Sequence, residues 1–129
     1  PLPAILGGLA FVDHIQRPGF WKTIGGLGEV LFAGLEDIAG RSRLPVVFQH
    51  HGSRFGIIFG TRDPVINYSQ ALVHDPETML EFCRQTTGRG VYFHDYGGGP
   101  CHHGYSLAHS LEDIDQALEA IDDSLQAIG

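Results

Sequence analysis

The sequence predicts an α+β domain, in which a small, mostly antiparallel sheet carries helices packed mainly on one face. Three observations predict this class. Apolar residues recur at helical spacing in several separate stretches, short segments alternate in polarity as half-buried strands do, and tight-turn residues lie between them. The expected order is helix, helix, strand, strand, helix, strand, strand, helix, with all elements in one layered unit.

Two helices are expected first. Residues 4–15 carry apolar side chains on more than one face, which is typical of a helix that several partners bury. The Arg17-Pro18-Gly19 break ends this helix, because proline restricts the residue before it and glycine adds backbone freedom. A second helix over residues 20–39 has one apolar stripe, and Gly40 is expected to end it. Close packing is expected to explain its early glycines, Gly25, Gly26 and Gly28.

A hairpin is expected next. Residues 46–50 and 55–59 read as strands joined across residues 51–54, where Gly52 can adopt a positive φ. An irregular link follows from Asp63.

The second half of the chain begins with a third helix. Asp75 followed by Pro76 is a helix-start pattern, and this helix is expected to run to Gly88. Alternation over residues 89–94 predicts a strand, and residues 104–108 are short enough to return beside it. The loop between these strands holds most of the unusual side chains.

The last helix is the best defined element. Ser110 can cap its N-terminus, and Asp113 lies in the first turn near the exposed amides. Its apolar residues alternate at spacings of three and four, and they are Leu111, Ile114, Leu118, Ile121, Leu125 and Ile128. One face of this helix must therefore lie on the rest of the domain.

Length and charge limit the classes of function. At 129 residues the chain is one domain with a single modest core. Fifteen acidic against eight basic residues give a formal charge of -7, which argues against a nucleic-acid partner or an anionic membrane surface. Two cysteines make no disulfide framework, and no signal peptide or apolar span of about 20 residues is present. A cytoplasmic setting is expected.

A metal site is one interpretation of the histidine-rich loop. The potential ligands between positions 94 and 109 are His94, Asp95, Cys101, His102, His103 and His109. Their spacing matches no usual ligand motif, and the adjacent His102 and His103 would point to opposite faces of a strand. The pattern therefore favours polar loop histidines over a metal centre.

Three further interpretations are weaker. Cys101 beside two histidines suggests a thiolate pair, but neighbours in sequence rarely have the facing geometry of a nucleophile and its base. The glycines 97–99 suggest a phosphate loop, yet Pro100 follows where a helix should start. Arg54 can clamp a carboxylate, whereas the simpler interpretation is a solvated arginine at a strand end.

Short motifs follow one another along almost the whole chain. They are Gly-Leu-Ala-Phe-Val-Asp at 8–13, Gln-Arg-Pro-Gly-Phe at 16–20, the helix at 31–40, His-Gly-Ser-Arg-Phe-Gly-Ile at 51–57, Arg-Gly-Val-Tyr-Phe at 89–93, and Ser106–Asp115. Together and in this order they resemble the C-terminal part of class III pyridoxal-phosphate-dependent aminotransferases. The glutamate-1-semialdehyde aminomutase-like branch is the most similar.

The resemblance implies a fold and a division of the chain. Residues 41–129 would form the small C-terminal domain of a fold-type I aminotransferase. Residues 1–40 would hold the end of the large-domain helix and a connecting helix, and the two parts together would form one compact unit. In that family the small domain closes over the substrate, while pyridoxal phosphate is held as a Schiff base on a lysine.

The sequence also departs from the family. Its only lysine, Lys22, does not match the cofactor lysine, and the aspartate and phosphate-binding segment of the family lie upstream of the matched region. No catalytic, cofactor-binding or metal residue is therefore assigned, and this chain alone is expected to bind no pyridoxal phosphate. The positions expected nearest to the substrate are Ser53, Arg54, His94, Tyr96, His102 and His103.

These expectations define the predicted function. The chain is predicted to be a C-terminal domain or fragment of an aminotransferase or aminomutase, not catalytically complete by itself, which supplies a substrate-side wall and domain closure. Its predicted partner is the missing large domain or a chain carrying it, in a homo-oligomer. The first helix should drive self-association or fold back on the sheet. The alternatives are a stand-alone binding or assembly module and, third, a metal-binding protein.

Overall fold

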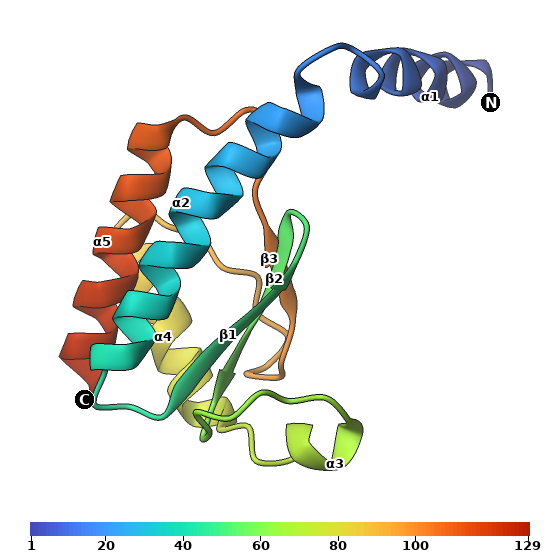
Figure 1. Ribbon diagram of the computed structural model, residues 1–129. Helices are drawn as coiled ribbons and strands as arrows, with labels where there is room; N and C mark the ends of the chain where they lie inside the picture. The colour runs from blue at the N-terminus through green and yellow to red at the C-terminus, as the bar shows by residue number, and fades with distance from the viewer.

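A three-stranded antiparallel sheet forms the centre of the computed structural model, which describes all residues 1–129 (Figure 1). Its order is β1 (Val46–His51), β2 (Arg54–Phe59) and β3 (His102–Gly104). The β1–β2 hairpin turns at Gly52, whose φ of 58° suits a glycine. The α+β prediction and the predicted hairpin are confirmed.

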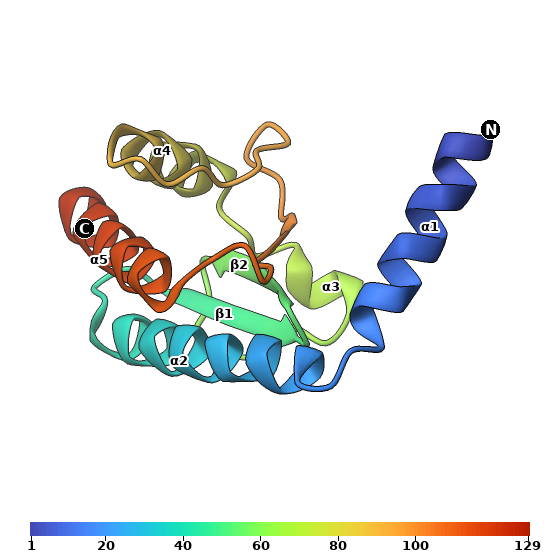
Figure 2. The same cartoon turned by 90° about the horizontal axis from the view of Figure 1, so that it is seen from above.

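The long helices cover one face of this sheet. Helix α2 (Phe20–Arg41) packs on β1, and α4 (Pro76–Gly88) packs on β2. Helix α5 (Leu111–Ile128) contacts both α2 and α4, so that the three helices enclose the core with the sheet (Figures 1 and 2). The link after β2, with the short helix α3 (Tyr68–Ala71), lies on the opposite side of the sheet from α5 (Figure 2).

The core lies between the sheet and these three helices. Its most deeply buried large side chains come from every layer, and they are Leu35, Val46, Ile57, Phe59, Met79, Phe82 and Ile121. From the predicted stripe of the last helix, Ile114, Ile121 and Leu125 are buried, whereas Leu111 stays exposed. The helical periodicity therefore identified the packing face correctly.

The predicted helix starts are confirmed. The Asp75 carboxylate accepts hydrogen bonds from the amides of Glu77 and Thr78 at the start of α4. At α5, the Ser110 hydroxyl accepts from the Asp113 amide, and the Asp113 carboxylate accepts from the Ser110 amide, which is a complete capping box.

The predicted end of the second helix is wrong by two residues. Helix α2 runs through Gly40 to Arg41 and ends in the extended residue Ser42. Its last carbonyls are bound instead by Arg62, whose guanidinium donates to Ala39 O at 2.9 Å and Ser42 O at 2.6 Å. A cation at a helix C-terminus replaces the glycine stop.

Close packing explains one of the three early glycines of α2. Gly28 lies against the Tyr105 hydroxyl, which leaves no room for a Cβ. Gly25 and Gly26 have no neighbour within 4 Å of a Cβ position, so close packing does not account for them.

The predicted strand pair at 89–94 and 104–108 is wrong. Residues 91–95 are irregular, and β3 begins earlier and pairs with β2. Gly90, at φ 85°, turns the chain back so that the Val91 amide donates to Thr86 O at the end of α4. Phe93 still enters the core while Tyr92 and His94 stay exposed, so the alternation reflects burial without a hydrogen-bonded ladder.

Helix α1 (Leu2–Ile15) extends away from the other elements (Figure 1). It contributes no buried residue, and its exposed apolar side chains are Leu2, Ile5, Leu6, Leu9, Phe11 and Val12. The prediction that this helix folds back on the sheet is wrong, while self-association stays a prediction. None of the helices combines the length and apolar character that crossing a membrane requires.

Candidate functional site

Five of the six predicted site residues line one hollow beside β3. Arg54 comes from β2, His102 and His103 from β3, and His94 and Tyr96 from the irregular segment that passes this strand. Tyr92, Phe93 and Gly104 complete the lining, and the cavity volume is about 320 Å³. The sixth residue, Ser53, does not line this hollow.

Two glycines lie opposite Arg54 and His102 on the neighbouring strands and leave room for their side chains. In the β2–β3 register, Arg54 faces Gly104 and His102 faces Gly56. A Cβ at Gly104 would lie 2.9 Å from Arg54 Cδ, so the arginine chain crosses the strand where only glycine leaves room. The side chain of Arg54 makes no ion pair or hydrogen bond, which leaves its guanidinium free for a ligand.

The two adjacent histidines point to opposite sides of β3, as the sequence predicts. His102 is exposed, while His103 is buried between Phe55 and Phe93, with ring centroids 5.7 and 5.0 Å away. Burial, together with smaller contributions from His102 and His94, lowers the pKa of His103 to about 4. His103 is therefore neutral near neutral pH and belongs to the floor of the hollow.

Cys101 lies closer to His103 than the sequence suggests. Because they are two residues apart on an extended chain, Cys101 Sγ and His103 Nε2 come within 3.6 Å. The thiol also donates to His94 O at 2.8 Å, and burial, with Asp95, raises its pKa. A neutral thiol beside a neutral imidazole is not the thiolate pair that nucleophilic chemistry needs.

His94 and two tyrosines form the exposed wall. The Tyr92 hydroxyl lies 3.2 Å from His94 Nδ1, and the Tyr96 ring meets the His94 ring edge to face at 4.2 Å. These contacts give an exposed imidazole a preferred orientation at the mouth of the hollow.

The glycine loop after this wall is a turn and not a phosphate cradle. Gly97 and Gly98 have φ values of 68° and 80°, and the Gly98 amide donates to the Asp95 carboxylate at 2.8 Å. An amide already bound by a carboxylate is not available to a phosphate group.

The lining of the hollow has one fixed positive charge, that of Arg54, within an acidic chain. It contains one arginine and three histidines and no carboxylate, although the whole chain has a formal charge of -7. No group of three or more His, Cys, Asp and Glu side chains is placed to hold a metal ion. The arrangement can bind an anion through guanidinium and imidazole N–H groups.

Ser53 lies instead in a second hollow of about 410 Å³, where the start of α2 meets the hairpin turn. Aromatic rings of Trp21, Phe32 and Tyr105 line it, and the Tyr105 hydroxyl donates to Ile24 O at 3.0 Å. Apart from the glycines of α2, no sequence feature predicts this hollow. Ser53 therefore does not share a hollow with the arginine and the histidines of the predicted site.

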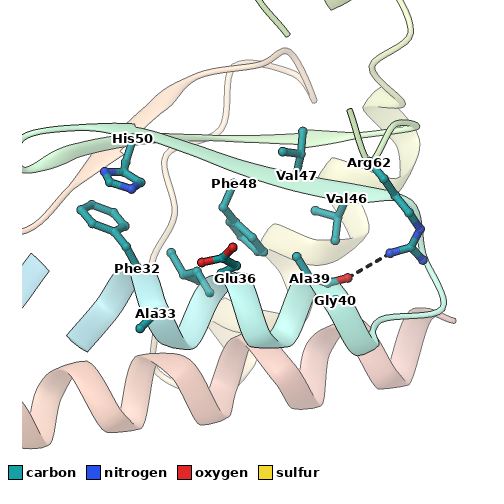
Figure 3. A pocket seen from close by; sticks show the side chains of 11 residues that line it. Phe32, Ala33, Glu36, Ala39, Gly40, Val46, Val47, Phe48, His50 and Arg62 are labelled. Carbon is teal, nitrogen blue, oxygen red and sulfur yellow. Dashed lines mark hydrogen bonds between the residues drawn. The ribbon is translucent and has the colours of Figure 1, made fainter. Parts of the chain in front are cut away.

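The largest of the three hollows described here, about 650 Å³, lies between α2 and the edge strand β1 (Figure 3). The His50 ring stacks on Phe32 at 3.6 Å, and Arg62 is occupied by the end of α2. None of the six predicted site residues lines it.

No protein-family model matches the chain, but its fold is similar to parts of solved transaminase structures. An omega-transaminase from Sphaerobacter thermophilus is 19% identical, with a TM-score of 0.67 over 88% of this chain and 25% of that one. The FumI protein of a Sphingopyxis species, solved as a pyridoxal-phosphate internal aldimine, is 23% identical, with a TM-score of 0.66 over 88% and 24%.

An ornithine aminotransferase from Plasmodium yoelii is also similar, at 15% identity and a TM-score of 0.59 over 85% of this chain and 25% of that chain. This chain therefore spans about a quarter of the length of the structures that it matches. At these identities, the likeness shows that the chain has the fold of part of a transaminase.

Proposed function

We propose that this chain is the C-terminal small domain of a pyridoxal-phosphate-dependent class III aminotransferase of the glutamate-1-semialdehyde aminomutase-like branch. The observation that carries the proposal is the match of 88% of the chain to a quarter of a transaminase. The collinear sequence motifs support the same assignment independently, because they follow the family's order from residue 8 to residue 115.

The residues of this chain do not fit the cofactor itself. A Schiff base needs a lysine beside the cofactor, and Lys22 is exposed at the start of α2 and lines none of the hollows described above. The glycine loop offers no free amide cradle at Gly98. The proposed role therefore includes no step on the cofactor, which would be held by a large domain in the same chain or in a partner chain.

The chain's own contribution would be to bind and orient the substrate. The free guanidinium of Arg54 can pair with a carboxylate in bidentate fashion, and His102 can donate a further hydrogen bond. Tyr92 and Tyr96 would form the walls beside the bound group. We propose that the hollow positions the carboxylate of an amino or oxo acid.

Helix α1 supports the proposed partner. Its apolar side chains are exposed along the whole helix, and a surface of this kind in an assembled protein is normally covered. The proposed occupant is the large domain, with which the small domain would assemble in a homo-oligomer.

Titration with acetate, followed by NMR on the isotope-labelled chain, tests the proposed role of the hollow. We expect saturable shifts of the Arg54 side chain and the His94 and His102 rings, with a millimolar dissociation constant. The R54Q variant should lose this response, while R43Q, which removes an exposed arginine far from the hollow, should keep it. Equal responses of both variants would contradict the proposal.

A further inference from the structure

We propose that His74 is the positioning residue of the hollow, because its imidazole ties the glycine loop that carries the His94–Tyr96 wall to the end of β2. The inference rests on hydrogen bonds within this chain. It is independent of the cofactor and of the ligand's identity.

His74 joins two segments that are far apart in the sequence. The Phe59 amide, at the end of β2, donates to His74 Nδ1 at 3.2 Å. His74 Nε2 lies 2.9 Å from Gly98 O, in the glycine loop. Since Nδ1 accepts, the neutral ring carries its proton on Nε2 and donates it to Gly98. One side chain thus bridges the sheet and the loop.

The residues around His74 hold it in place. The Asp75 amide donates to Phe59 O at 3.2 Å, so positions 74 and 75 bind both backbone groups of the same β2 residue. The backbones of Gly60 and Val73 lie in close contact just past the strand, because a Cβ at Gly60 would overlap Val73 O. His74 is therefore attached to the most deeply buried strand, where Phe59 is 1% exposed.

Gly98 is held from three sides. Its carbonyl accepts from His74, its amide donates to Asp95, and a Cβ on it would lie 2.9 Å from Pro76 Cβ at the start of α4. Gly98 is buried although its neighbour Gly97 is exposed. The loop is thus pressed onto α4 at a single residue, and His74 provides its link to the sheet.

The tie acts on the wall of the hollow through short connections. Tyr96 and Gly99 form an isolated β-bridge on either side of Gly98, and the Cys101 thiol donates to His94 O. Fixing Gly98 therefore restrains Tyr96 through its bridge to Gly99, and it restrains His94 through the Cys101 thiol on the far side of the loop. His74 itself does not line the hollow, so it acts through the loop.

Acid should weaken this tie. A doubly protonated imidazole has no acceptor for the Phe59 amide, so that half of the bridge is lost. The charged groups around it are Asp75, whose carboxylate caps α4, and Asp95 on the loop. Asp75 attracts a cationic ring and offsets part of the loss, yet it cannot supply an acceptor at Nδ1.

Hydrogen exchange of the Phe59 and Gly98 amides, measured by NMR on the whole chain, tests the inference. The H74A variant should lose about five- to tenfold protection at the Phe59 amide relative to Ile121 in the core, since this amide donates directly to His74. The Gly98 amide keeps its bond to Asp95 and should lose less protection, through loosening of the loop when its carbonyl loses the His74 donor. The H74Q variant offers an amide that accepts and donates, so it should restore part of this protection.

The pH dependence of amide protection distinguishes the His74 hydrogen bonds from general packing. Protection of Phe59 in the natural chain should fall once acid doubly protonates the His74 ring, after correction for intrinsic exchange, whereas H74Q should show no such fall. The H14Q variant, on α1, is the matched control and should behave as the natural chain.

Two outcomes would overturn the inference. One is unchanged protection of Phe59 and Gly98 in H74A, and the other is an equal loss at Ile121, which would mean general destabilisation. Acetate titration of H74A adds a separate readout, because a disordered wall should weaken binding about threefold or more. If acetate does not bind even the natural chain, the proposed role of the hollow fails while the exchange result still decides this inference.

Discussion

Helices α1 and α5 are both rich in apolar residues, yet only α5 buries apolar side chains within this chain. Helix α5 has one apolar stripe and a charged outer face, and it buries Ile114, Ile121 and Leu125 within this chain. Helix α1 is apolar all round and buries nothing. A helix with a polar face can therefore complete its packing inside a small domain, whereas one without a polar face needs a partner from outside.

The largest expected effect separates the two helices by stability. I121A removes a fully buried side chain and should lower the free energy of unfolding by about 2–5 kcal/mol. I5A makes the same change on α1, where the side chain is exposed, and should change it by about 0.5 kcal/mol or less. Urea denaturation of both variants measures the contrast. A similar loss in I5A would mean that α1 is packed in solution.

The next effect concerns acid. The pKa of His103 is lowered by burial to about 4, while the unfolded chain titrates near 6.5. Between these values the unfolded state binds more protons, so the free energy of unfolding should fall by up to about 3 kcal/mol as the pH falls from 6.5 to 4. H103Q should lose this component in urea denaturation at several pH values, and the exposed H102Q should keep it. Parallel pH profiles for both variants would contradict the assignment.

A smaller effect is expected at the start of α5. S110A removes the hydroxyl that accepts from the Asp113 amide, and it should cost about 1 kcal/mol of unfolding free energy. S69A, at an exposed serine in the short helix α3, is the control and should be close to neutral. Thermal unfolding of both variants checks the capping box, which a neutral S110A would rule out as a stabilising contact.

Charged substitutions on α1 should have the smallest effect on stability and the largest effect on self-association. The double variant L6E and F11E places charges on the exposed surface of α1 and should leave the unfolding free energy almost unchanged. Self-association of the natural chain, measured by light scattering, should decrease in this variant. A natural chain that is monomeric at all concentrations would contradict the prediction of self-association.

The elements that the sequence predicts well are those whose packing depends on local periodicity. Helix α5 and the β1–β2 hairpin follow from spacing and turn residues within a few positions. The segment 91–95 shows the limit, because Phe93 alternates like a strand residue although its partners are helix α4 and the core. The pairing of β3 with β2 joins residues about fifty positions apart, which periodicity does not encode.

The sequence likewise predicts only part of the candidate site. The loop composition and the resemblance identify Arg54, His94, Tyr96, His102 and His103, and the structure brings them to one hollow. Ser53 is adjacent to Arg54 in sequence but lines the other hollow, because Ser53 lies in the hairpin turn whereas Arg54 begins β2. The bridge through His74 has no local signature, since it joins residues 15 and 24 positions away.

The most direct measurement is a pyridoxal-phosphate titration of the purified chain, followed by borohydride reduction and intact-mass analysis. We expect no saturable absorbance change and no specific adduct, because Lys22 lies outside every hollow described above. The cofactor would then belong to the large domain, and this domain would supply the substrate-side wall. A saturable change with one adduct at Lys22 would contradict this division of roles.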